Sequence, residues 1–134
     1  MRYTATLLAT ALLASPLQAD EASLGKDRFK AVCMACHKLD RGPQMLAPPV
    51  FAVQNHYLRV HPGKAEFVQA VVDWVRSPET NKSLMPGAVR RFKLMPPMPL
   101  PEDELKAIAE FLYDARFQEP EWYKEHFEAE HGQQ

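Results

Sequence analysis

The sequence predicts an all-α fold, and three observations carry this prediction. Apolar residues recur at helical spacing in KAEFVQAVVDWVRS (64–77) and in PEDELKAIAEFLYD (101–114). A third amphipathic segment, residues 22–32, leads into the stretch AVCMACHK, which holds both cysteines of the chain. No β-hairpin signal and no internal repeat interrupts these segments. We therefore expect a few helices joined by loops rich in proline and glycine.

The first expected helix, residues 22–32, places Leu24, Phe29 and Val32 on one apolar face. Gly25 lies among them and offers a point where another helix can approach closely. Residues 38–50 follow as a loop, because RGPQMLAPPV is rich in proline and glycine.

The second expected helix follows Pro62 and Gly63 and ends before Pro78, since the residue preceding a proline disfavours helical geometry. A loop with three methionines comes next. The last expected helix of the domain begins at Pro101, where a proline and three acidic residues suit the first turn. A short additional helix is expected after Pro120.

The N-terminal segment, residues 1–19, has the layout of a secretory signal. One basic residue, Arg2, precedes an apolar run, and a small residue, Ala19, stands at the expected cleavage site. The apolar run is shorter than the roughly 20 residues that span a bilayer, so a transmembrane anchor is not expected. We therefore expect export to the periplasm and cleavage after Ala19.

The expected mature chain, residues 20–134, suits one small domain, which we place at 20–117 with a C-terminal extension at 118–134. The full sequence has 16 basic and 17 acidic residues, so it lacks the charge signature of a nucleic-acid-binding protein.

The cysteines stand in CMACH (33–37), and C-x-x-C-H is the attachment signature of c-type haem. Two thiols separated by a short turn can add to the two vinyl groups of one haem, and the adjacent histidine can then reach the iron. Cys33 and Cys36 are thus the expected anchors and His37 the expected proximal ligand, with one covalently attached haem c as the cofactor.

Three other readings of the cysteine pair are weaker. A thioredoxin-like dithiol would follow a strand, whereas the segment before Cys33 is amphipathic and helical. A structural zinc site would need a second cysteine or histidine pair at similar spacing. A plain disulfide between the two cysteines would make the histidine next to them, His37, a chance occurrence.

The chain resembles the class I cytochromes c in three places that occur in the family's order. GKDRFKAVCMACH resembles the family's first helix running into its haem motif, with Gly25 and Phe29 at four-residue steps before Cys33. LKAIAEFLYD resembles the last helix, with Phe111 where an aromatic residue packs across the first helix. The MPP turn before that helix is similar to the turn of short bacterial members. The resemblance implies the class I fold, a few helices wrapped around one covalently attached haem.

The resemblance also implies a proline carbonyl that accepts a hydrogen bond from the haem histidine. In APPVF, Pro48 or Pro49 could supply it. Trp74 could donate its indole N–H to a haem propionate, or it could simply fill the core. Arg90, Arg91 and Lys93 could pair with a propionate, form a basic rim or be plain solvated residues.

Three methionines compete as the sixth iron ligand, while Met34 and Met45 are expected to pack. In short bacterial members the ligand opens an MPP turn about sixteen residues before the aromatic of the last helix, and Met95 meets both conditions. Met85 and Met98 remain alternatives, Met98 lying three residues closer to that helix.

Histidine ligation is a further alternative for the sixth position. His56 or His61 could form a bis-histidine site of lower potential. His126 and His131 lie in the polar tail and are expected to be exposed.

The implied function is single-electron transfer between a donor and an acceptor protein, by a monomeric, non-enzymatic carrier that docks weakly and transiently. One alternative is a haem subunit held to a dehydrogenase or an oxidase, with residues 118–134 as the docking element. Another is a ligand-sensing haem protein without a stable sixth ligand.

Overall fold

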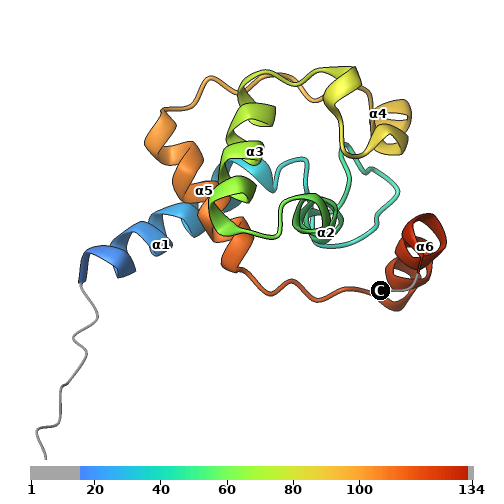
Figure 1. Ribbon diagram of the computed structural model, residues 1–134, viewed down its shortest axis with the longest axis horizontal. Coiled ribbons are helices and arrows are strands. Elements are labelled where there is room, and N and C mark those ends of the chain that lie inside the picture. The colour runs from blue at the N-terminus through green and yellow to red at the C-terminus, as the bar shows by residue number, and fades with distance from the viewer. Residues whose placement is uncertain (1–15, 133–134) are drawn as a thin grey trace, which may run out of the picture.

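The computed structural model describes residues 16–132, and within them it is entirely helical, with no β-strand, which confirms the all-α prediction. Figure 1 shows the helices packed as a small bundle of crossing elements. In chain order the elements are α1 (Pro16–Arg28), the π-helical turn η1 (Phe29–Cys33), α2 (Val50–Val60), α3 (Lys64–Arg76), the 3₁₀ turn η2 (Thr80–Lys82), α4 (Pro86–Phe92), α5 (Glu102–Asp114) and α6 (Glu121–His131).

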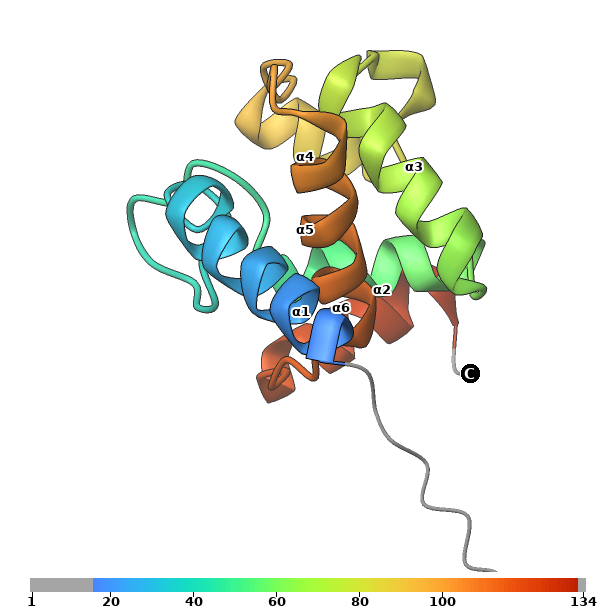
Figure 2. The same cartoon turned by 90° about the vertical axis from the view of Figure 1, so that its left-hand side faces the viewer.

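The central contact of the fold is the crossing of α1 and α5, which are far apart in the sequence and adjacent in space (Figures 1 and 2). Gly25 is buried at this crossing, and a Cβ on it would overlap the carbonyl oxygen of Ala107 and lie 3.2 Å from the Cβ of Phe111. One turn later, the rings of Phe29 and Phe111 are 5.5 Å apart. The close approach expected at Gly25 is therefore present, against the α5 backbone.

Replacing Gly25 by valine is expected to destabilise the domain, because the new side chain must push α1 away from the α5 backbone. Overpacking of this kind costs about 1–3 kcal/mol, and we expect the upper part of that range. Gly42→Val is the matched control, because no atom lies within 4 Å of a Cβ built there. Urea unfolding monitored by circular dichroism measures both. Equal stability of the two variants would contradict the close crossing.

The main core lies between α3 and α5, and residues of η1 and α2 contribute to it. Phe67 and Val72 of α3 and Leu105 and Ile108 of α5 are almost completely buried there. Gln54 of α2 ties that helix to the end of α5, since its amide nitrogen donates to the carbonyl oxygens of Leu112 and Ala115 at 2.5 and 2.8 Å. Burial of the α3 and α5 apolar faces follows their helical periodicity.

The expected helix after Pro120 is α6, and it packs against α2. Tyr123 is 2% exposed, and its ring meets that of Phe51 edge to face with centroids 4.8 Å apart. Trp122 and Phe127 join the same small aromatic cluster. Aromatic pairs in this arrangement add stability beyond the area they bury, so the tail helix is part of the folded domain.

The first helix differs from the expectation in its start and in its buried face. Helical backbone begins at Pro16 instead of residue 22, since a proline is tolerated in a first turn. Leu24 is 43% exposed, whereas Gly25 and Phe29 are buried and Val32 is half-buried. Gly25 and Phe29 are four residues apart and share a face, while Leu24 and Phe29 are separated by about 140° around the helix.

Two helices were not expected from the sequence. The segment 83–100 was predicted as a loop, yet α4 occupies part of it, with Pro86 in its first turn and the carbonyl of Met85 accepting from the amides of Ala88 and Val89 at 3.0 and 3.2 Å. Helix α4 ends at Phe92, and the C-cap residue Lys93, with a φ of 73°, turns the chain into the segment leading to α5. Helix α2, the other unexpected one, begins directly after Pro49.

Most of the expected signal segment, residues 1–15, lies outside the described residues, and residues 16–19 belong to α1. Within residues 16–132 no helix combines the length and the hydrophobicity needed to cross a bilayer.

Candidate cofactor site

The CMACH segment begins at Cys33, the last residue of η1, and forms a compact turn. The Cys33 carbonyl accepts from the amides of Cys36 at 3.1 Å and His37 at 2.8 Å, so the cysteine and histidine backbones are held within one turn. Both cysteines are free thiols. Cys33 is half-buried and packs against the main core, whereas Cys36 is exposed.

Burial raises the pKa of the Cys33 thiol to about 11, and the neighbouring Cys36 contributes in the same direction. A catalytic dithiol has the opposite property, because its attacking thiol is activated by a lowered pKa. The environment of Cys33 therefore does not favour the thioredoxin-like reading of this motif.

His37 is held by the segment before α2. Its Nδ1 lies 2.8 Å from the carbonyl oxygen of Pro48, so of the two prolines that could make this contact, Pro48 makes it. A carbonyl oxygen can only accept, so Nδ1 carries the proton and donates it. The neutral ring then presents an unprotonated Nε2, which is the form that binds a metal.

Burial lowers the pKa of His37, an effect only partly offset by the hydrogen bond to Pro48. The imidazole is therefore held neutral around pH 7, and protons compete weakly for the nitrogen that would act as a ligand.

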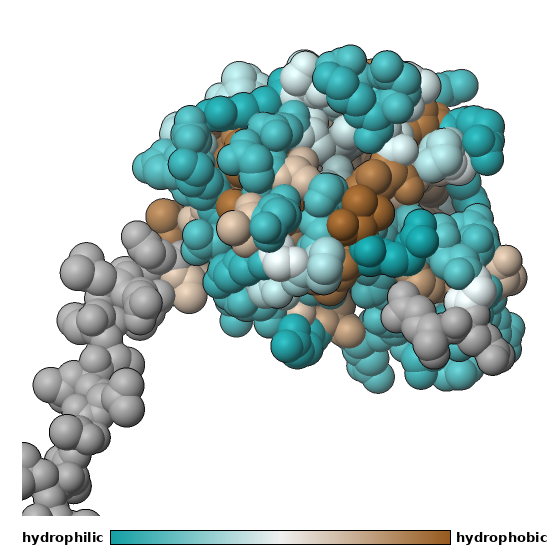
Figure 3. Space-filling model, viewed as in Figure 1, coloured by the Kyte–Doolittle hydropathy of each residue, from teal (hydrophilic) through white to brown (hydrophobic). Residues whose placement is uncertain are grey.

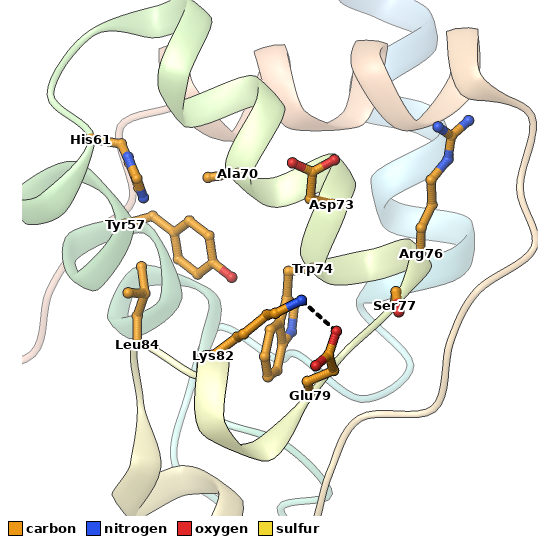
Figure 4. Close-up of a pocket in the computed structure, with 10 residues that line it drawn as sticks. All are labelled: Tyr57, His61, Ala70, Asp73, Trp74, Arg76, Ser77, Glu79, Lys82 and Leu84. Atoms are coloured by element: carbon orange, nitrogen blue, oxygen red, sulfur yellow. Dashed lines mark hydrogen bonds and ion pairs between the residues drawn. The ribbon is translucent and has the colours of Figure 1, made fainter.

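Trp74 lines a cavity of about 440 Å³ between α2, α3 and the η2 turn. Figure 4 shows its indole and the Tyr57 ring directed into this space, with Lys82 reaching across to its ion-pair partner Glu79 at 2.5 Å. Arg76 also lines the cavity. Asp73 and Glu79 line the cavity as well, and the two cations are paired with carboxylates, Arg76 with Glu102 and Lys82 with Glu79.

The three candidate methionines lie at different places. Met95 is half-buried in the extended segment between α4 and α5. Met98 is half-buried in the same segment, and its amide donates to the Val75 carbonyl at 2.9 Å, which fixes the segment to the end of α3. Met85 is the N-cap residue of α4 and packs against the small aromatic cluster.

Met85 and Pro48 line one cavity of about 580 Å³ between α4, the loop before α2 and α6, and Met45 also borders it. Met95 is not among the residues that line this cavity or the Trp74 cavity. Met34 is half-buried and packs against the main core, as expected of a packing residue.

The histidines considered as alternative ligands lie on α2 or directly after it. His56 is buried on α2, with Nδ1 2.8 Å from the Ala52 carbonyl and Nε2 3.1 Å from Nε2 of His131. His61 follows α2 and lines the Trp74 cavity. His131 was expected to be exposed, but only 16% of its side chain is accessible, because α6 packs it against His56.

Sequence reasoning missed Tyr57, which is buried and faces Trp74 across the cavity. The signal was available: Val50, Val53 and Tyr57 recur at the spacing of one helical face, although prolines directly before Val50 obscure the pattern.

Comparison with known proteins identifies a relative in Aquifex aeolicus (strain VF5), described as an uncharacterized protein. The two sequences are 31% identical over 129 residues, which cover 80% of this chain and 85% of the relative. No family model matches the chain, and no solved structure matches it.

Proposed function

The chain belongs to one family with the uncharacterized Aquifex protein, and we propose that it is an exported monohaem c-type cytochrome that carries single electrons between redox protein partners. The observation that carries the proposal is the combination of C-x-x-C-H with a His37 ring whose Nδ1 donates to the Pro48 carbonyl. Together they give two free thiols and one neutral imidazole nitrogen within a single turn.

The donor set fits a c-type haem. Cys33 and Cys36 would each add an S–H group across a vinyl double bond, with sulfur bonding to one carbon and the thiol hydrogen passing to the other. His37 would bind the iron through Nε2, and the hydrogen bond to Pro48 would orient its ring and strengthen it as a donor. When bound, the haem supplies an iron centre that takes up and releases one electron.

The sixth ligand we propose is Met95, with Met85 and Met98 as alternatives. A thioether sulfur is a soft ligand and favours the reduced state. Pro96 and Pro97 directly follow Met95 and restrict the backbone that would present its sulfur. The hydrogen bond from the Met98 amide to the Val75 carbonyl fixes the same segment further along the chain.

Trp74 is the residue we propose for a propionate contact. Its indole faces the cavity that Lys82 also lines, and a buried carboxylate needs a donor such as an indole N–H. Arg90 and Arg91 are exposed on α4, where they can form a basic rim for a partner.

The surface supports a carrier that docks transiently. Figure 3 shows a mainly hydrophilic face on which apolar residues form only small groups. Tyr123 of the tail is buried against Phe51 of α2, and the half-buried Phe127 packs on His56 of the same helix, so both are engaged within the chain. These observations favour the free carrier over the docked subunit.

A redox titration of the purified, exported protein tests the proposal. We expect a reversible uptake of one electron per chain, without continued turnover of the reductant. The reduced protein should not bind carbon monoxide, because His37 and Met95 would both be bound to the iron. Carbon monoxide binding would instead support the ligand-sensing alternative, and the absence of any redox-active centre would overturn the proposal.

A further inference from the structure

A second cluster of potential ligands lies between α2 and α6. His56, Glu130 and His131 each offer one donor atom, and these three atoms lie within 4.8 Å of one another. His56 is 6% exposed, whereas Glu130 lies at the surface. The residues are separated by up to 75 positions in the sequence, so only the docking of α6 brings them together.

The tautomer of His56 suits a metal ligand. Its Nδ1 lies 2.8 Å from the Ala52 carbonyl, which can only accept, so this nitrogen carries the proton. The Nε2 atom of the neutral ring is then unprotonated and faces His131. Metal-binding histidines commonly donate their other ring nitrogen to a backbone carbonyl in this way.

The distance between the two rings is compatible with a shared ion. The Nε2 atoms of His56 and His131 are 3.1 Å apart. Two nitrogens bound to zinc at about 2.0–2.1 Å and a tetrahedral angle lie about 3.3–3.4 Å from each other. A shift of a few tenths of an ångström in the last turn of α6 would therefore bring both nitrogens to bonding distance of one ion.

Glu130 completes the donor set. Its Oε2 atom is 3.9 Å from Nε2 of His131, and its Oε1 atom is 3.4 Å from Nε2 of the more exposed His126. The cluster borders the cavity of about 580 Å³ between α4 and α6, which gives an ion a route to the site. Two imidazoles and one carboxylate form a ligand set typical of zinc.

We propose that His56, Glu130 and His131 bind one zinc ion, with water in the fourth position. The ion then links α6 to α2. Binding displaces the hydrogen bond between the two rings and releases any proton held on Nε2 of His131. Because the ion binds only when α6 is docked, it stabilises the folded chain by mass action. The site uses none of the CMACH residues, and the proposal does not rest on the proposed electron transfer.

Equilibrium dialysis of the exported protein against Zn²⁺ tests the site, using protein without a histidine tag. We expect one tightly bound zinc per chain and a rise in the thermal unfolding midpoint on zinc addition. His131→Asn should weaken binding by at least about a hundredfold, since loss of even an outer-shell partner costs about 10–100-fold. Glu130→Gln should weaken binding in the same direction.

His61→Asn is the matched control, because His61 lines the Trp74 cavity and not the cavity that the three proposed ligands border, so it should leave zinc binding unchanged. His131 lies in the last turn of α6, so its replacement leaves the main core intact, and a circular dichroism spectrum verifies this. The proposal is overturned if no zinc binds at about a hundred micromolar, or if His131→Asn binds zinc as the unaltered chain does. The latter result would place the ion elsewhere, for example on Cys33 and Cys36.

Discussion

Replacing Cys33 and Cys36 together by serine is expected to abolish covalent haem attachment. A serine hydroxyl does not form the thioether bond, and within the full sequence no other cysteine can substitute. In a host that attaches haem to exported proteins, the chain should carry haem through a denaturing gel, and the double variant should carry none.

The single variants refine this prediction. Each of Cys33→Ser and Cys36→Ser leaves one thiol, so haem retained by either variant should be held through one bond and in smaller yield. Met34→Ala, inside the same motif, is the control and should retain covalent haem. If the double-serine chain still retained haem after denaturation, the attachment would lie elsewhere and the role of CMACH would be wrong.

Replacing Met95 by alanine is expected to remove the sixth ligand and lower the reduction potential, because the soft thioether favours the reduced iron. The weak thioether-to-iron absorption band near the red edge should be present in the oxidised protein and disappear completely in this variant. Met85→Ala and Met98→Ala should keep the band.

The three variants also separate the alternatives. Met85 lines the cavity that Pro48 borders, and loss of the band on its replacement alone would assign the ligand to the start of α4. Persistence of the band in Met95→Ala would contradict the Met95 assignment. Each variant keeps the prolines and the backbone hydrogen bond from residue 98 to the Val75 carbonyl, so the segment between α4 and α5 should stay in place.

The parts of the fold that could be predicted are those whose residues carry a local signal. Helices α3 and α5 have strong apolar periodicity. Pro78 follows the end of α3, and Pro101 directly precedes the start of α5. The contact of Gly25 with α5 was expected because only a glycine admits another backbone so closely.

Other parts depend on contacts that the sequence does not encode locally. Helix α4 is seven residues long and begins within a proline-rich stretch, so periodicity could not reveal it. The exposure of Leu24 depends on the angle at which α1 crosses α5. The pairing of His56 with His131 follows from the docking of α6 through Tyr123, which no spacing along the chain predicts.

In the candidate site, too, the residues that are contiguous in the sequence could be predicted and the others could not. CMACH is contiguous, so its residues were evident together, and the choice between Pro48 and Pro49 needed only the structure of one loop. The methionine could not be selected with equal clarity, because Met85 and Met95 lie on opposite sides of α4 in the chain and each precedes a proline.

The intact mass of the exported protein, measured under denaturing conditions, tests the central claim most directly. We predict a chain beginning at Asp20 whose mass exceeds that of the polypeptide by one haem. A mass equal to the polypeptide alone, or lower by the two hydrogens of a disulfide between Cys33 and Cys36, would contradict the proposed cytochrome.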